Sequence, residues 1–240
     1  MLIKGSKVAR VMNRRREELA ERYFEGNAAS YDHIARISTL GLDGWWKGKI
    51  LKRLPKAPDR ILEQASGTGI LTCKIAQLFP ECRVVGVELH DGYLNIARTK
   101  VRDLGLRNVE FIHGRAENVI LEGEFDCIVS DYLAKYVDLD LLVAHARGML
   151  RKDGLLIMHE LTRPTHPFFL ALWNAHFTFL RAYGNWRHPE WDFAFNDVPS
   201  FLGRTRWVDE LTQALRANGF SDIGVENQFF GASAIVSARK

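Results

Sequence analysis

Residues 60–69 read RILEQASGTG, a short apolar segment that runs directly into a glycine-rich turn. The segment predicts a buried strand, and the residues after the turn, 70–79, predict a helix. Gly67 and Gly69 have no Cβ, so the backbone of the turn can approach a ligand while the helix N-terminus points at it. Such a turn serves NAD, FAD or S-adenosylmethionine (SAM), and by itself it indicates only this group of cofactors.

The same alternation of strand and helix continues on the C-terminal side of the turn. Short apolar or β-branched runs predict strands, and longer segments between them predict helices, at residues 83–88, 92–104, 109–113, 125–130, 139–150 and 154–160. Strands that alternate with helices of ten or more residues indicate parallel βαβ units with right-handed crossovers. Residues 222–228 and 232–238, separated by three residues, predict an antiparallel hairpin. We therefore expect an α/β fold: a Rossmann-like, doubly wound, mostly parallel seven-stranded sheet with a C-terminal antiparallel hairpin.

Two segments lie outside this pattern. Residues 1–58 predict an N-terminal helical segment that ends near Pro55 and Pro58, and residues 59–240 predict the cofactor-binding domain. Within that domain, residues 164–203 carry eleven aromatic side chains and predict a cap insertion. The aromatic residues of the cap either form its core or line an apolar wall for a ligand.

Composition excludes several classes of protein. The net charge of +4 permits an anionic partner without requiring one, and 26% charged residues fit a folded globular chain. Three scattered cysteines favour a reducing compartment, and no spacing of Cys or His predicts a metal site. No signal peptide and no membrane-spanning run is predicted, so we expect a cytoplasmic protein.

Two carboxylates favour SAM over a dinucleotide. The turn fails the dinucleotide fingerprint, because Thr72 occupies the position that needs a small residue. Glu63 precedes the turn, where a carboxylate suits the cationic amino group of a methionine moiety. Glu88 ends the second strand, and its two oxygens match the two ribose hydroxyls. Leu89 is then expected against the adenine face, and the segment that contains Arg115 and Ala116 at the adenine edge.

Several segments together resemble the ubiquinone/menaquinone-biosynthesis C-methyltransferase family over nearly the whole chain. The similar segments are residues 31–47, 63–69, 125–128, 149–154, Glu160 with Pro164, and 230–232. The resemblance implies SAM as methyl donor and a small lipophilic aromatic acceptor, foremost a prenylated quinol that is methylated on carbon. It also implies cofactor contacts at Tyr31, Ala65 and Ser130.

The chain departs from the family pattern at a few positions. The family carries Arg-Asn after the fourth strand, where this chain has Lys135 and Tyr136. Lysine keeps the charge of arginine but loses its planar fork of donors. Arg115 stands where the family has an acidic residue or its amide, and Ala35 stands in place of an asparagine.

The catalytic candidates lie at the carboxyl ends of the fourth and fifth strands, where doubly wound folds bind their ligands. They are Asp131, Lys135 and Glu160, one of which would help to remove a proton from the acceptor. His159 alternates with Glu160 along a strand, so the two side chains should point to opposite faces, and His159 is expected to be packed.

Some alternatives stay open at this point. The basic N-terminal helix, residues 1–26, either is a solvated face or rests on anionic lipid. The acceptor is a quinol or another small molecule, such as a phospholipid amine or a natural-product phenol, and a non-catalytic SAM-binding protein is a further alternative. No motif predicts a nucleic-acid partner, and the sequence defines neither the oligomeric state nor the methylated atom.

Overall fold

The computed structural model describes residues 21–240, except the side chains of residues 193 and 194. Residues 21–24 are helical, and the basic positions predicted for an N-terminal helix lie outside the described residues. None of the described helices combines the length and the apolar character that a membrane span needs.

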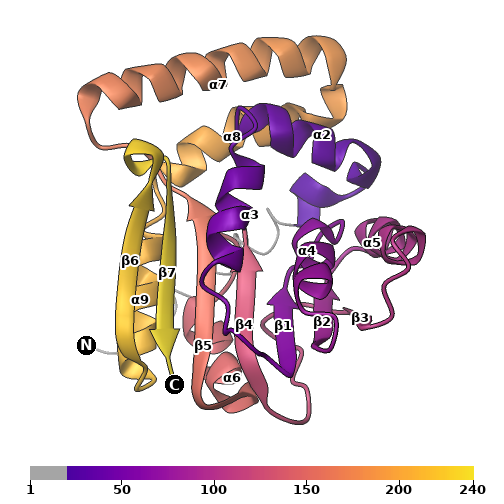
Figure 1. Cartoon of the computed structure of the whole chain (residues 1–240). Coiled ribbons are helices and arrows are strands. Elements are labelled where there is room, and N and C mark those ends of the chain that lie inside the picture. Colours follow the sequence, from indigo (N-terminus) through magenta and orange to yellow (C-terminus); the bar gives the residue numbers. More distant parts are fainter. Residues whose placement is uncertain (1–20) are drawn as a thin grey trace.

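A single seven-stranded sheet forms the centre of the described chain (Figure 1), in the order β3-β2-β1-β4-β5-β7-β6. The strands are β1 (Arg60–Gln64), β2 (Arg83–Glu88), β3 (Val109–His113), β4 (Phe125–Asp131), β5 (Leu150–Leu161), β6 (Ser221–Gln228) and β7 (Ser233–Arg239). Neighbours among the first five pair in parallel, while β7 pairs antiparallel with both β5 and β6. The predicted fold class and the C-terminal hairpin are therefore confirmed.

The helices cover both faces and the carboxyl end of this sheet. They are α2 (Ala28–Ser38), α3 (Asp43–Leu51), α4 (Ile70–Leu78), α5 (Asp91–Asp103), α6 (Leu139–Met149), α7 (Pro167–Arg187), α8 (Asp192–Leu202) and α9 (Trp207–Ala217), with 3-10 turns η1 (Pro189–Trp191) and η2 (Phe229–Gly231). The segment predicted as one or two helices before Pro55 forms two, α2 and α3. The segment predicted as a cap contains α7 and α8, which lie over the carboxyl ends of the strands (Figure 1).

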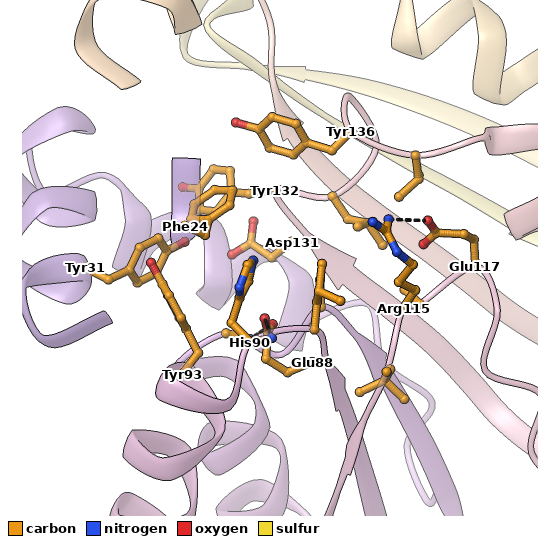
Figure 2. Close-up of a pocket in the computed structure, with 18 residues that line it drawn as sticks. Phe24, Tyr31, Glu88, His90, Tyr93, Arg115, Glu117, Asp131, Tyr132 and Tyr136 are labelled. Atoms are coloured by element: carbon orange, nitrogen blue, oxygen red, sulfur yellow. Dashed lines mark hydrogen bonds and ion pairs between the residues drawn. The ribbon is translucent and has the colours of Figure 1, made fainter. Parts of the chain in front are cut away.

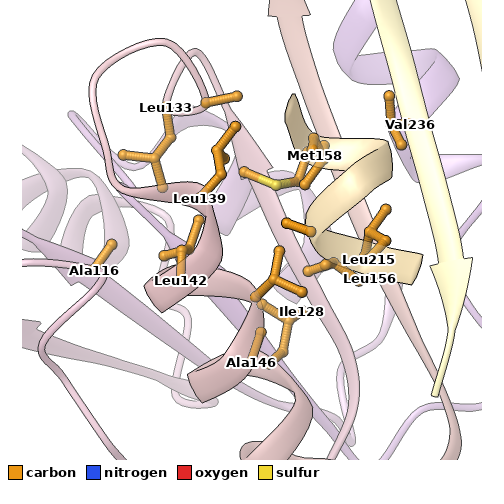
Figure 3. Packing of buried hydrophobic residues seen from close by; sticks show 14 of the residues in the cluster. Ala116, Ile128, Leu133, Leu139, Leu142, Ala146, Leu156, Met158, Leu215 and Val236 are labelled. Carbon is orange, nitrogen blue, oxygen red and sulfur yellow. The ribbon is translucent and has the colours of Figure 1, made fainter. Parts of the chain in front are cut away.

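One apolar core lies on each face of the sheet, so the central strands are buried on both faces. Every residue of β4 is buried. Alternate residues of the strand serve opposite cores: Ile128 joins the core under α6 and α9 (Figure 3), whereas Cys127 and Val129 join the core under α3 and α4. This packing holds the carboxyl ends of β1, β2, β4 and β5 at one edge, beneath α2, α7 and α8.

Candidate functional site

A cavity of about 710 Å³, counted with its open mouth, lies at the carboxyl ends of β1, β2 and β4 (Figure 2). Most residues that the sequence predicted for cofactor binding line it: Tyr31, Ala65, Gly67, Glu88, Leu89, Arg115 and Ala116, together with the catalytic candidate Asp131. We call it the cofactor cavity. Its position is the one that doubly wound sheets use for their ligands.

The glycine-rich turn forms the floor of the cofactor cavity. Gly67 has φ +55°, and a Cβ built on it would meet no protein atom within 4 Å, so it would enter open space at the cavity wall. Gly69 has φ +79°, and a side chain at this position would clash with α5, because a Cβ there would lie 2.9 Å from the Cβ of Ala97. The first glycine thus keeps room for a ligand, and the second allows α5 to pack against the turn.

Glu88 holds the turn and the next loop in place. One carboxylate oxygen accepts the backbone N–H of Gly67 at 2.9 Å, and the other accepts that of His90 at 3.0 Å. The side chain is buried and lines the cavity. Each oxygen can accept a further hydrogen bond, so the carboxylate can also receive two hydroxyl groups of a ligand.

Acidic groups dominate the polar part of the cavity wall. The carboxylates of Glu88, Glu117 and Asp131 line the cavity, together with the guanidinium of Arg115. Arg115 forms ion pairs with Glu117, at 3.4 Å, and with Glu21, so its charge is already balanced. A wall of this kind favours a cationic ligand and disfavours a pyrophosphate.

Asp131 belongs to a buried network of charged side chains between β4, β5 and α3. Its carboxylate lies 2.7 Å from Lys47 Nζ and 2.6 Å from His159 Nδ1. Burial by itself would raise the pKa of Asp131, but Lys47 and His159 outweigh it and hold the pKa at about 2. Lys47 also pairs with Asp43, which accepts a hydrogen bond from the Tyr132 hydroxyl at 3.1 Å. Asp131 is therefore a fixed negative charge and a poor proton acceptor near neutral pH.

A second cavity of about 680 Å³ lies beside the first, under α7 and α8. Four aromatic residues line both cavities and form their common wall: Phe24, Tyr31, Tyr132 and Tyr136. Other apolar side chains from α2, η1, α7 and α8 complete the second cavity, among them Ile34, Trp191, Phe177 and Phe195. We call it the apolar cavity. A ligand in it would lie against the same aromatic wall as a ligand in the cofactor cavity.

One buried ion pair stands at the apolar cavity. Lys135 lines the cavity, and its Nζ lies 2.6 Å from a carboxylate oxygen of Glu160, which is completely buried. The ammonium also lies over the ring of Tyr136, 4.4 Å from its centroid. Burial lowers the pKa of Lys135, while Glu160 opposes that shift. The second oxygen of Glu160 has no hydrogen-bond partner among the described residues.

Some predicted site residues lie behind the cavity walls. Glu63 accepts a hydrogen bond from the Thr72 hydroxyl, and burial raises its pKa to about 8. Ser130 and His159 are fully buried, as expected for a packed histidine. The cofactor contacts assigned to Glu63, Gly69 and Ser130 stay predictions, since none of these residues lines the cofactor cavity.

The structure adds site residues that sequence reasoning missed. Tyr93 lines the cofactor cavity one turn into the helix that follows Glu88, and this short spacing could have indicated it. Phe24 and Lys47 come from N-terminal segments whose positions over the sheet no local pattern predicts. Tyr132, by contrast, is among the groups that the sequence places at the carboxyl end of the fourth strand, and it lines both cavities. Its φ is +62°, a left-handed conformation that costs a non-glycine residue energy and is found at functional sites.

Comparisons with known proteins agree with this geometry. The model of the ubiE/COQ5 methyltransferase family matches residues 12–240. A demethylmenaquinone methyltransferase of Geobacillus stearothermophilus is 26% identical over 232 residues, covering 93% of this chain and 97% of the relative. The ubiquinone/menaquinone biosynthesis C-methyltransferase UbiE of Shewanella sp. (strain W3-18-1) is 28% identical over 167 residues, covering 68% of this chain and 66% of the relative.

Solved structures share the fold. The pyocyanin biosynthetic protein PhzM superposes with a TM-score of 0.63 at 17% identity, over 92% of this chain and 61% of that one. Phosphoethanolamine N-methyltransferase 2 of Haemonchus contortus, in complex with S-adenosyl-L-methionine, gives 0.59 at 16% identity, over 81% of this chain and 52% of that one. The present chain thus spans about half to three fifths of these two structures.

Proposed function

Because the chain belongs to the ubiE/COQ5 methyltransferase family, we propose that it transfers the methyl group of SAM to a ring carbon of a lipophilic, prenylated quinol. The observation that carries the proposal is the aromatic wall shared by an acidic cofactor cavity and an apolar cavity. Relatives named for menaquinone and ubiquinone biosynthesis support the acceptor class.

The residues of the cofactor cavity fit SAM. The cradle at Gly67 leaves room where any side chain would intrude. Glu88 offers two carboxylate oxygens to a vicinal diol, and the ionised Asp131 favours the positive charges of a sulfonium and an ammonium group. When bound, SAM supplies a methyl group on a positively charged sulfur.

The chain's own residues then align the acceptor and prepare its ring. The common aromatic wall excludes water from the junction of the two cavities and holds a flat ring against it. Lys135 lies in the apolar cavity, where its ammonium stabilises the oxyanion of an ionised quinol hydroxyl. Ionisation makes the neighbouring ring carbon nucleophilic. Bound SAM would supply the methyl group to this carbon and would leave as the neutral thioether. The methylated ring would then lose its hydrogen as a proton while its oxygen is protonated again, so that overall one proton is released to solvent.

Lys135 also favours a quinol over the alternative methyl acceptors. The ammonium of Lys135 can donate a hydrogen bond to a quinol oxygen, whereas the ammonium of a phospholipid headgroup carries only donors and finds no acceptor in Lys135. The apolar lining favours an acceptor with a hydrocarbon chain over a small water-soluble phenol.

A panel of acceptors tests the proposal. The purified chain is incubated with SAM labelled in its methyl group and, in separate reactions, with a short-chain prenyl quinol in detergent, phosphatidylethanolamine or a water-soluble phenol. We expect label in the quinol alone. Transfer only to the amine or to the water-soluble phenol would contradict the proposed acceptor, and calorimetry that shows no SAM binding would contradict the cofactor.

A further inference from the structure

The outward face of α7 is apolar along its whole length. The helix lies on the outside of the molecule, over the carboxyl end of the sheet (Figure 1). Its exposed apolar residues fall within an arc of about 100° at 3.6 residues per turn. They are Phe168, Ala171, Leu172, Ala175, Phe179, Ala182 and Trp186, which we call the outer stripe.

The outer stripe is not needed to hold α7 on the protein. The opposite face of the helix does this through Phe177 and Leu180, which pack with Trp191 and Phe195 in a separate apolar cluster. The side chain of Trp186 is nevertheless 77% exposed and that of Phe179 63% exposed. Two aromatic side chains exposed to this degree on one helix face indicate a binding surface.

The hairpin tip extends the stripe at the N-terminal end of the helix. Phe169, next to Phe168, stacks on Phe230 of η2 with ring centroids 4.1 Å apart. Phe230 is itself 65% exposed, and it contacts the partly exposed Phe229. From Phe168 to Trp186 the helix alone extends about 27 Å at 1.5 Å per residue, so the apolar surface is long and narrow.

All formal charges on α7 and on the segment that leads into it are positive. Between Glu160 and Glu190 the sequence contains no Asp or Glu, and its charged residues are Arg163, Arg181 and Arg187. The Arg187 guanidinium lies over the ring of Trp186 at 5.4 Å, which places a cation beside an amphipathic ring. An apolar helix face that contains a tryptophan, on a helix whose charged residues are arginines, is typical of helices that lie in the interface of an anionic bilayer.

We propose that the outer stripe docks on an anionic lipid surface, with α7 lying parallel to it, and that the acceptor enters the apolar cavity from that surface. This inference rests on the proposed function for its acceptor. Phe177, on the inner face of the same helix, lines the apolar cavity, so one helix joins the lipid to the cavity wall. A second copy of the chain fits less well, because a two-fold contact would bring two surfaces of the same positive charge together.

Sedimentation with lipid vesicles tests the docking surface. The full chain is mixed with vesicles of phosphatidylcholine alone or with phosphatidylglycerol added, in the absence of SAM. We expect the double variant Phe179→Ser with Trp186→Ser to lose vesicle affinity by roughly tenfold or more. Arg181→Gln with Arg187→Gln should lose about fivefold for each arginine on anionic vesicles and little on neutral ones.

Matched controls remove exposed apolar side chains elsewhere. Leu78→Ser with Leu104→Ser changes two half-exposed leucines at the C-terminal ends of α4 and α5. Because these helices run antiparallel to the strands, both leucines lie at the end of the molecule opposite α7. The control should bind vesicles like the wild type, and circular dichroism and the melting temperature show whether each variant is folded.

Turnover separates this inference from the proposed function. We expect the Phe179/Trp186 variant to methylate a quinol in detergent at the wild-type rate but a quinol embedded in vesicles much more slowly. Wild-type turnover without vesicle binding would overturn the docking surface and leave the function standing. Vesicle binding through the stripe without quinol turnover would overturn the function alone. If the variant instead changes the oligomeric state in sedimentation velocity and binds vesicles unchanged, a second copy covers the stripe and the inference fails.

Discussion

At the scale of single residues, the neighbours of two buried charged side chains decide what those side chains can do chemically. Asp131, an acid at a strand end, is held ionised by Lys47 and His159 and is a fixed charge rather than a base. Lys135, a buried cation, keeps its partner Glu160 at 2.6 Å while its ammonium faces the apolar cavity. In the proposed function, the charge of Asp131 favours the cofactor and Lys135 acts in the chemical step.

Gly67→Val should abolish SAM binding, because the new side chain would fill the open space at the cavity floor. Isothermal calorimetry measures the loss. Gly105→Val is a matched control, since Gly105 has a similar φ of +65° and also meets no atom within 4 Å, but lies away from the cavity. Both variants lose stability because valine strains a left-handed backbone. Equal SAM affinity in the two variants would contradict the assigned cavity.

Lys135→Ala should lower kcat on a quinol by at least tenfold and leave the affinity for SAM nearly unchanged, because the lysine acts mainly on the reacting oxyanion. The variant leaves Glu160 buried without its partner, so a loss of about 3–5 kcal/mol in the free energy of unfolding is also expected. Lys135→Arg keeps the charge beside Glu160 and should retain turnover. If the Lys135→Ala variant is folded and fully active, Lys135 does not take part in the chemical step.

At the scale of elements, the cap shapes the apolar cavity through one close contact between α7 and α8. Gly184 on α7 lies against Phe195 of α8, and a Cβ built on the glycine would lie 2.1 Å from the ring. Phe195 lines the apolar cavity on its other side. The spacing of the two helices therefore controls the size of the cavity.

Gly184→Ala should push Phe195 aside, raise KM for the quinol severalfold and leave the SAM dissociation constant unchanged. Steady-state kinetics with both substrates and calorimetry with SAM measure the two effects. Gly148→Ala on α6 is the control, because a Cβ there meets nothing within 4 Å. That control should be neutral or stabilise the protein by up to about 1 kcal/mol. An unchanged quinol KM in Gly184→Ala would show that the α7–α8 contact does not define the cavity.

The local pattern of apolar and turn residues predicts the sheet better than it predicts α7 and α8. The strands, the glycine-rich turn and the hairpin follow from short β-branched runs and turn residues that the structure confirms. The aromatic segment that forms α7 and α8 has apolar residues on both faces of α7, so periodicity cannot tell which face meets the core. The pairing of Lys135 with Glu160 also could not be predicted, because the two residues lie 25 positions apart in the sequence and only the packed sheet brings them together.

At the scale of the whole molecule, stability should depend on pH through Glu63. Burial raises its pKa to about 8, whereas an unfolded chain has a glutamate pKa near 4.3. Between these values the folded chain binds a proton that the unfolded chain has lost. The free energy of unfolding should therefore fall as pH rises through this window, at up to about 1.4 kcal/mol per pH unit.

Glu63→Gln should flatten this dependence, because the amide does not titrate. Denaturant unfolding at a series of pH values measures it, with Glu110→Gln as a control on an exposed strand position. An equal pH slope in the wild type and in Glu63→Gln would show that Glu63 is ionised in the folded chain.

The proposed function requires the whole molecule, because two cavities must meet at an aromatic wall for a methyl group to pass from SAM to a ring carbon. The most direct test uses a prenyl quinol that carries deuterium at the ring position to be methylated, with the product analysed by mass spectrometry. Transfer to carbon displaces the deuterium, so we expect a methylated product that has lost it. A methylated product that retains the deuterium, with the new methyl group on oxygen, would contradict the account.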